Sequence, residues 1–260
     1  MSRVAAVTGA STGIGRATAV AFGELGWTVA VGARRLEQLE ETAKLVDGAG
    51  GRALVHVLDV TDSASVDAFC DFVTRAAGPI DVLVNNAFRM DVFQPFDQVD
   101  LAKWRKIFDV NVWGSLAITQ ACVPHLKKAA ADQGDASIVF IISMSMRKIR
   151  SLEGGYSSSK AALQTAAKTM ALELGPAGVR VNCIAPGFIG GPNVEVYLGW
   201  ESEARGISRD DVRREIESNI PLGRIPPQDE IANSVVFFIS PWSSVITGQT
   251  LDVNGGEFFG

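Results

Sequence analysis

Tyr156 and Lys160 have the residue types and the spacing that proton transfer requires. The chain of 260 residues has two tyrosines, and one of them stands four positions before a lysine in the run Tyr-Ser-Ser-Ser-Lys. A free phenol has a pKa of about 10 and exchanges protons poorly at neutral pH. An ammonium group about 5 Å away, at an effective dielectric constant of about 20, favours the phenolate by roughly 3 kcal/mol, or roughly two pKa units. We therefore expect Lys160 to bring the pKa of Tyr156 toward working pH.

The same spacing also has a purely structural interpretation. Residues four apart on a helix share one face, so an exposed tyrosine above a solvated lysine would give the same pattern. A hydroxyl that stabilises charge on a reacting oxygen would strengthen the catalytic interpretation. Ser143 and Ser145 both end an apolar run and could supply it. Because alternate residues of a strand share a face, the pattern leaves the choice between them open.

A glycine-rich turn supplies a second candidate site. The run Thr-Gly-Ala-Ser-Thr-Gly-Ile-Gly, residues 8–15, lies between a short apolar run and a segment with helical periodicity. Glycines allow a tight turn and let backbone N–H groups approach a pyrophosphate, which the helix dipole also favours. Glycines serve ordinary turns too, but the position between strand and helix favours nucleotide binding.

The elements that must position these residues alternate along the chain. Apolar, β-branched runs predict strands at residues 4–8, 28–33, 53–60, 82–86, 137–143, 180–185 and 250–253. Helical periodicity lies between them, at 14–25, 36–46, 65–76, 101–128, 156–174 and 229–240, with Asp62 and Asp229 as N-cap candidates. Such alternation predicts one α/β domain over 1–260, a doubly wound, mainly parallel seven-stranded sheet with helices on both faces.

Composition excludes several classes of function. The chain has 24 basic and 29 acidic residues and a net charge of −5, which argues against nucleic-acid or membrane-surface binding. No apolar run reaches the roughly 18 residues of a membrane span, and there is no room for a signal sequence before the first strand. Three cysteines in apolar contexts indicate buried thiols, so we expect a cytoplasmic protein. The two histidines, His56 and His125, are interpreted as structural, and no metal site is expected.

Taken together, the motifs resemble those of the short-chain dehydrogenase/reductase family over nearly the whole chain, in its single-domain branch. The glycine spacing T-G-x-x-x-G-x-G is the family's, and the Tyr-x-x-x-Lys pair is its catalytic pair. Further matches, in order, are Asp59-Val60, Asn85-Asn86-Ala87, Asn111, Ser143 and Pro186-Gly187. The separation of thirteen residues between Ser143 and Tyr156 is the family's and favours Ser143 over Ser145. The resemblance implies a Rossmann-type fold.

The resemblance also implies a mechanism and a set of contacts. Hydride would pass between a nicotinamide and a carbonyl carbon while Tyr156 exchanges the proton, Ser143 holds the oxygen, and Lys160 binds the nicotinamide ribose. Lys160 and a water near Asn111 would relay protons to solvent. The implied cofactor-binding residues are Gly9, Ser11, Thr12, Gly13, Ile14, Gly15, Arg34, Arg35, Asp59, Val60, Asn86, Ala87, Tyr156, Lys160, Pro186, Gly187 and Ile189.

The second predicted strand indicates which cofactor is used. It ends in Ala33, where an NAD-preferring member of the family usually carries aspartate, and Arg34-Arg35 follow. A guanidinium can pair with a 2′-phosphate in bidentate fashion, so NADP is favoured over NAD. The arginines could also simply begin a solvated helix.

Two positions depart from the family, and one matching segment bears on the substrate. Phe88 stands where the family usually has glycine, and the threonine that commonly follows Pro-Gly is missing, so backbone groups of Phe188 and Ile189 would hold the carboxamide. Residues 190–224 contain no predicted strand and match in place the family's variable substrate lid. Phe88, Phe93, Met144 and the lid aromatics suggest an apolar ketone or secondary alcohol.

The leading interpretation is therefore an NADP-dependent oxidoreductase of ketones and secondary alcohols. The alternatives are a dinucleotide-sensing or scaffold protein of the same fold, an NAD-dependent alcohol or dihydrodiol dehydrogenase, and an epimerase or dehydratase of the longer branch. The filled Asn–Ser–Tyr–Lys set disfavours the sensor, and the chain length disfavours the epimerase. In the family, the helices at 101–128 and 156–174 form a four-helix interface, which implies a homotetramer or homodimer.

Overall fold

The protein folds around one parallel sheet of seven strands. A computed structural model describes residues 2–259. The strands are β1 (Val4–Thr8), β2 (Thr28–Ala33), β3 (Arg52–Val57), β4 (Val82–Asn85), β5 (Ala136–Ile141), β6 (Val179–Pro186) and β7 (Thr250–Val253). Their order is β3-β2-β1-β4-β5-β6-β7, and each neighbouring pair is parallel. The predicted doubly wound, Rossmann-type sheet is confirmed.

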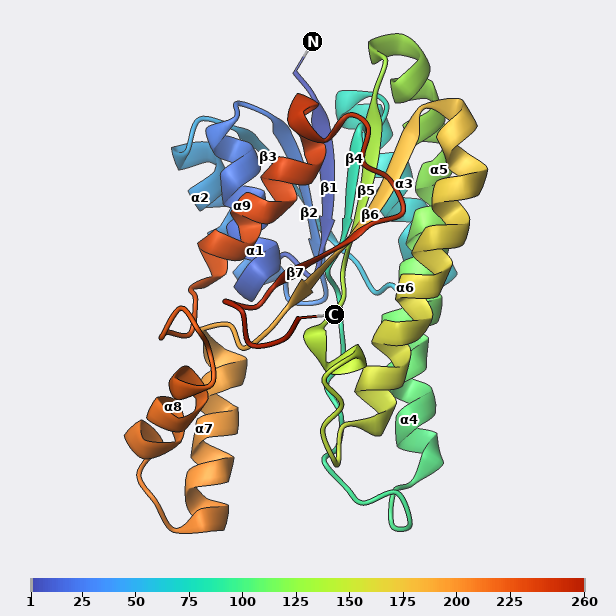
Figure 1. Ribbon diagram of the computed structural model, residues 1–260. Coiled ribbons are helices and arrows are strands. Elements are labelled where there is room, and N and C mark those ends of the chain that lie inside the picture. The colour runs from blue at the N-terminus through green and yellow to red at the C-terminus, as the bar shows by residue number, and fades with distance from the viewer. Residues whose placement is uncertain (1, 260) are drawn as a thin grey trace.

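Helices cover both faces of this sheet (Figure 1). On one face lie α1 (Gly13–Glu24), α2 (Leu36–Gly48) and α9 (Gln228–Ile239), and on the other α3 (Ser63–Ala77), α5 (Ser115–Gln133) and α6 (Gly154–Leu174). Each face has its own apolar cluster, with Phe22 and Phe238 on the first side and Phe69 and Phe140 on the second. Burial on both faces explains why the central strands read as unbroken apolar runs.

Strand β3 corrects one expectation. The sequence predicts a strand to Val60, but pairing with β2 ends at Val57. This strand is the sheet edge, and several of its side chains are partly exposed. Leu58, Asp59 and Val60 follow it, so this part of the predicted strand is a connection that leads toward α3.

The predicted long helix over 101–128 is three segments. It comprises α4 (Leu101–Phe108), a π-helical stretch (Asp109–Gly114) and α5. Such wide turns are uncommon and occur often at functional sites. At the other helix ends, Asp62 caps α3 as predicted by accepting a hydrogen bond from the Ala64 amide at 3.0 Å. Asp229 does not cap α9; it lies in the first turn, and Pro227 is the N-cap.

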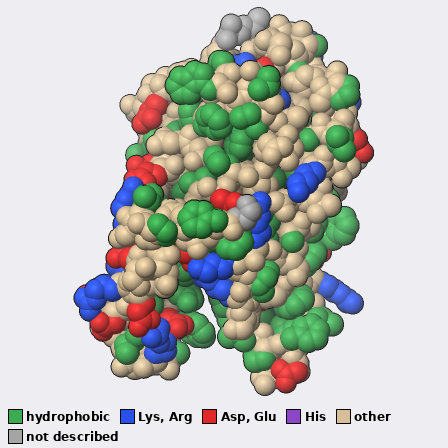
Figure 2. All heavy atoms as spheres, in the orientation of Figure 1, with side chains coloured by type: hydrophobic (Ala, Val, Ile, Leu, Met, Phe, Trp, Pro, Cys, Tyr) green, Lys and Arg blue, Asp and Glu red, His purple; other side chains and the backbone are tan. Residues whose placement is uncertain are grey.

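The segment 190–224 contains no strand, as the sequence predicts, and it folds as two helices. They are α7 (Pro192–Arg205) and α8 (Arg209–Ser218), and they extend beyond the carboxyl ends of the strands (Figure 1). A small apolar cluster of their own, built around Leu198, Val212 and Ile216, joins them. Figure 2 shows the pair at the lower left, with mixed acidic and basic side chains on its surface. These helices form a small layer separate from the two sheet clusters.

Candidate active site

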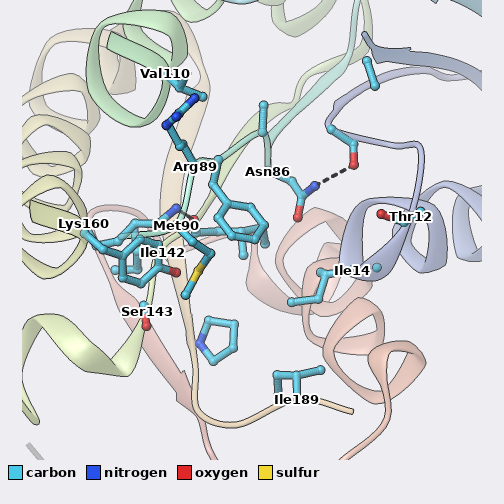
Figure 3. Close-up of a pocket in the computed structure, with 18 of the residues that line it drawn as sticks. Thr12, Ile14, Asn86, Arg89, Met90, Val110, Ile142, Ser143, Lys160 and Ile189 are labelled. Carbon is cyan, nitrogen blue, oxygen red and sulfur yellow. Dashed lines mark hydrogen bonds between the residues drawn. The ribbon is translucent and has the colours of Figure 1, made fainter. Parts of the chain in front are cut away.

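One cavity of about 1230 Å³ lies at the carboxyl ends of the strands. Its walls come from the loops after β1, β2, β4, β5 and β6 and from α7, which is part of the predicted lid at 190–224. In an open α/β sheet, ligands bind at this edge where the strand order reverses, which here is between β1 and β4. In Figure 3, Thr12 and Ile14 lie at one end of the cavity and Ser143 and Lys160 at the other.

The turn after β1 requires its glycines for two reasons. Gly9 and Gly13 have φ angles of 63° and 67°, a region that favours glycine. A Cβ on Gly15 would lie 2.4 Å from the Asn86 amide nitrogen and 2.5 Å from the Gly9 carbonyl oxygen. That amide donates to the carbonyls of Thr8 and Gly9, both at 3.0 Å, and so ties the turn to the end of β4. Figure 3 draws one of these two bonds.

The first turn of α1 fits a phosphate group. Its N-cap residue, Thr12, makes no side-chain capping hydrogen bond, and the first turn holds no acidic side chain. Nothing among the described residues lies within 4 Å of a Cβ built on Gly13, so the turn is open there. Unpaired N–H groups and a helix dipole at such an opening favour an anion. The residues present therefore fit the pyrophosphate of a dinucleotide.

The end of the cavity beside β2, where the adenosine is predicted to bind, carries basic side chains. Arg34 and Arg35 line it and are exposed, and neither makes an ion pair within residues 2–259. Asp59 lines it as well; hydrogen bonds from Thr61 lower the pKa of its carboxyl group, and Arg34 adds a smaller effect. One Asp59 oxygen thus accepts both hydrogen bonds from Thr61, so it is already occupied within its own turn. No carboxylate stands at position 33 to repel a phosphate.

Tyr156 and Lys160 lie near each other on α6, as the spacing predicts. The Lys160 nitrogen is 5.6 Å from the centre of the Tyr156 ring and donates to the Ile141 carbonyl at 2.8 Å. The prediction that Lys160 lowers the pKa of Tyr156 is wrong for the protein without a cofactor. Burial raises the pKa of Tyr156 to about 12, and burial lowers the pKa of Lys160 to about 7. Loss of solvation is the largest cause of both shifts, because each group is charged only at a cost inside the protein.

Ser143, rather than Ser145, faces the tyrosine. A hydrogen-bonding interaction with the Ser143 side chain lowers the pKa of Tyr156 and so opposes part of the rise. The argument from strand alternation does not apply, because β5 ends at Ile141 and Ser145 lies in a 3₁₀ turn, Met144–Met146. The Ser145 amide donates to the Ser143 oxygen at 3.2 Å, which orients the hydroxyl.

Asn111 lies behind the cavity wall, within the π-helical stretch. Its amide nitrogen donates to the Arg89 carbonyl at 3.1 Å and to the Ser159 hydroxyl at 2.9 Å, and its oxygen accepts from the Arg89 amide at 2.7 Å. Both donors are therefore used, and only the oxygen could hold a further group. The catalytic role implied by the resemblance stays a prediction; the contacts show that Asn111 joins the loop after β4 to α6.

Most residues implied by the resemblance meet at this cavity. Of the implied catalytic and cofactor-binding residues, all line it except Asn111 and Gly15, which lie behind its wall. Phe88 is part of the wall: its ring centre is 6.2 Å from that of Tyr156 and 5.6 Å from the Lys160 nitrogen. The sequence pattern did not single out Asp91 or Glu153. Both are buried acids in irregular or terminal segments, where no periodicity marks them.

The substrate end of the cavity has aromatic walls. Phe93, in the loop after β4, stacks on Trp200 of α7 with ring centres 5.9 Å apart, and Tyr197 lies 5.5 Å from Phe188. Val194 and Leu198 are both buried in the cluster between α7 and α8, and of the two only Val194 also lines the cavity. The aromatic faces favour a ligand with an apolar body.

Comparison with known proteins identifies the family. A model described as "Enoyl-(Acyl carrier protein) reductase" matches residues 9–257. The 3-oxoacyl-[acyl-carrier-protein] reductase of Thermotoga maritima is 34% identical over 256 residues, covering 98% of this chain and 97% of that protein. The chain belongs to the short-chain dehydrogenase/reductase family. The cis-4-hydroxycyclohexanecarboxylate dehydrogenase of Sinomonas cyclohexanicum is 32% identical, covering 98% and 96% of the two chains.

Solved structures of this family agree in fold and differ in cofactor. An actinorhodin polyketide ketoreductase variant with NADPH superposes with a TM-score of 0.92 at 30% identity, covering 98% of this chain and 97% of the other. An NAD⁺-bound xylitol dehydrogenase gives 0.89, also at 30% identity, covering 98% of each. Membership makes the protein an oxidoreductase of carbonyl or alcohol substrates that uses a nicotinamide dinucleotide. The choice between NAD and NADP varies among such short-chain dehydrogenases.

Three further findings concern the other expectations. All three cysteines are buried and free. No group of three or more His, Cys, Asp or Glu side chains within the described chain could hold a metal ion. In residues 2–259, every helix is too short or too polar to cross a membrane.

The lid is expected to exchange its amide hydrogens faster than the sheet. Segment 190–224 has no strand partner, is rich in charge and glycine, and rests on a small cluster of its own. Such a region opens at low free-energy cost, and a bound dinucleotide should slow it. Hydrogen exchange with and without NADP measures this. Exchange as slow in the free lid as in β1 or β5 would contradict the expectation.

Proposed function

We propose that this protein is an NADP-dependent oxidoreductase that interconverts a ketone and a secondary alcohol, with Tyr156 as general acid and base. The observation that carries the proposal is the joint position of Tyr156, Lys160 and Ser143 at one end of a cavity whose other end fits a dinucleotide. An NAD-dependent alcohol or dihydrodiol dehydrogenase and a catalytically weak sensor remain the alternatives.

The bound cofactor would supply or accept the hydride at its nicotinamide ring. The protein's residues handle the oxygen of the substrate. In ketone reduction, Tyr156 gives its proton to that oxygen as the carbon receives the hydride, and Ser143 donates a hydrogen bond that stabilises the developing charge. A pKa of about 12 keeps Tyr156 protonated at neutral pH, which is the form that reduction needs.

Lys160 has capacity for a second role at the same place. One of its three donors is used by the Ile141 carbonyl at 2.8 Å, which leaves two for ribose hydroxyls of the cofactor. Neighbouring acceptors and a dinucleotide's phosphate charge would favour its ammonium form over the neutral form that burial favours. Backbone groups of Phe188 and Ile189 are proposed to hold the carboxamide, since both residues line the cavity.

A cofactor assay with a panel of ketones tests the proposal. Reduced nicotinamide absorbs at about 340 nm, so turnover of any ketone lowers the signal. We expect aryl ketones to be consumed with NADPH, because the substrate end is lined by aromatic rings. If the protein binds NADPH but turns over no ketone and oxidises no secondary alcohol, the sensor alternative is the better description.

The remaining proposals concern location and assembly. We infer a cytoplasmic protein from the charge and the buried thiols, and a homotetramer or homodimer from the family's use of α5 and α6 as an interface. Leu172 of α6 is 81% exposed and does not line the cavity. A large apolar side chain so exposed on this helix is in keeping with a covered face.

A further inference from the structure

A buried carboxylate that the mechanism does not use faces the substrate end of the cavity. Glu153 retains 8% of its exposure and lines the cavity. Within residues 2–259 its side chain makes no hydrogen bond and no ion pair. Burying an unpaired carboxylate costs free energy, and burial accordingly raises the pKa of this group. A group kept at such a cost in a ligand cavity marks a site of recognition.

A structural role for this carboxylate is already filled by another residue. Glu153 is the N-cap residue of α6, where an acid commonly accepts hydrogen bonds from the first turn. Its side chain makes no such bond. Instead Asp91, from the loop after β4, accepts a hydrogen bond from the Tyr156 amide at 2.7 Å. Asp91 therefore caps α6, and the Glu153 carboxylate is available to a ligand in the cavity.

The nearest cation is also committed elsewhere. Arg150 attracts Glu153 at longer range, but its guanidinium pairs with Glu257 at 3.1 Å and lies 4.2 Å from the centre of the Phe188 ring. Lys148 pairs with the same Glu257 oxygen at 3.0 Å. The C-terminal segment thus takes up the positive charge that could otherwise neutralise Glu153.

Backbone conformation before the helix fixes where Glu153 lies. Leu152 has a φ of 69°, a left-handed conformation that is costly for a bulky residue. Phe93, on the lid-facing wall, has a φ of 52°. Phe93 lines the cavity, and Leu152 directly precedes Glu153, which also lines it. Strained backbone of this kind persists where the surrounding structure holds a side chain in a required place.

The position of Glu153 relative to Tyr156 indicates what it would contact. The two residues are three apart at the start of α6, so they share a face. Their electrostatic interaction contributes to the raised pKa of Tyr156, and Glu153 acts in the same direction on Tyr197 of the lid. Glu153, Tyr156 and Tyr197 all line the same cavity, so the carboxylate lies within electrostatic reach of both the proton donor and the aromatic wall. Because Glu153 and Tyr156 are three residues apart and line one cavity, we expect a ligand group at Glu153 to lie close to the reacting carbonyl.

We propose that Glu153 is a substrate-recognition residue, which accepts a hydrogen bond from a hydroxyl group that the ketone carries one or two carbons from its carbonyl. This inference rests on the proposed function and narrows its substrate class to hydroxy ketones with an apolar body. A hydroxyl fits better than an ammonium group, because Lys160, which the proposed function keeps as an ammonium, lines the same cavity and repels cations. An acceptor built for a hydroxyl rejects analogues that lack it, since the buried carboxylate is then left unpaired.

Matched pairs of ketones test the role of the carboxylate. The probes are α-hydroxyacetophenone and its methyl ether, and β-hydroxypropiophenone and its methyl ether, each reduced with NADPH. In at least one pair, the unmodified protein should favour the hydroxyl compound in kcat/KM by about 10- to 100-fold, the range of a hydrogen bond to a charged group. Glu153→Gln should reduce this ratio, and Glu153→Leu should abolish it while the ether is reduced at least as well as before.

Controls separate recognition from a structural effect. Glu203→Gln removes an exposed carboxylate on α7 outside the cavity and should leave the ratio unchanged. The affinity for NADPH and the unfolding temperature should be similar in both Glu153 variants. A ratio that survives in Glu153→Leu, or equal losses for both members of a pair, overturns the inference, as does the absence of any preference in the unmodified protein.

A binding measurement keeps this test independent of turnover. If no ketone is reduced at all, the proposed function fails, but the same pairs can be compared by ligand-detected NMR in the presence of NADPH. Tighter binding of a hydroxyl compound than of its ether, lost in Glu153→Leu, supports the inference. Equal binding within both pairs overturns it.

Discussion

Replacing Tyr156 with Phe should lower kcat for ketone reduction by about 10² to 10⁴, the usual cost of losing a positioned acid–base group. The substitution removes one hydroxyl and leaves the ring, which packs edge-on against Phe88. The Tyr156 backbone amide still donates to Asp91, so the start of α6 is preserved. Stopped-flow or steady-state absorbance with NADPH measures the loss, and NADPH affinity should change little.

The chain provides a comparison for this variant. Tyr197, the other tyrosine, lies on the lid, where its ring contacts Phe188 and Trp200. Tyr197→Phe keeps those ring contacts and removes no proton donor at the carbonyl, so its kcat should fall far less than that of Tyr156→Phe. If Tyr156→Phe retains the kcat of the unmodified protein, the phenol is not the proton donor and the mechanism must be abandoned.

The sheet could be predicted because the apolar pattern of its strands in the sequence agrees with their burial in the fold. The runs at 4–8, 28–33 and 250–253 are strands with the predicted bounds, since hydrophobic continuity and burial coincide there. The wrong predictions lie where one sequence pattern is compatible with two different structures. Apolar residues 58–60 read as strand, yet the pairing of β3 ends at Val57. The π-helical stretch around Asn111 has the periodicity of a helix, so nothing in the sequence marks its wider turn.

The residues that form the site could be predicted where sequence motifs exist, but the directions of their pKa shifts could not. Spacing alone placed Tyr156 and Lys160 together, but the sign of their pKa shifts depends on desolvation, which only the packed structure shows. The sequence did not predict a role for Glu153 for a similar reason. A glutamate before two glycines looks like an exposed turn residue, and its burial depends on the conformation of Leu152 and on a cap supplied by Asp91.

The basic side chains at one end of the cavity predict a second large effect, on cofactor binding. Arg34→Ala should weaken binding of NADPH far more than that of NADH, by about 2 to 3 kcal/mol for a lost charge-assisted pair. Arg34 lines the cavity without an ion-pair partner among the described residues, and position 33 offers Ala rather than an acid. The unmodified protein should therefore have the higher kcat/KM with NADPH. Titration of intrinsic fluorescence with each cofactor, before and after substitution, gives the two dissociation constants.

A second basic residue, on the helix that follows Arg34, is the matched control. Lys44 of α2 is exposed and does not line the cavity, so Lys44→Ala removes one positive charge without removing a phosphate contact. If the effect of Arg34 were only long-range attraction, both variants would weaken NADPH by similar amounts and would respond similarly to added salt. A direct guanidinium–phosphate pair predicts a large change for Arg34→Ala alone. Equal kcat/KM for the two cofactors in the unmodified protein would refute the NADP assignment without any variant, because nothing would then distinguish the 2′-phosphate.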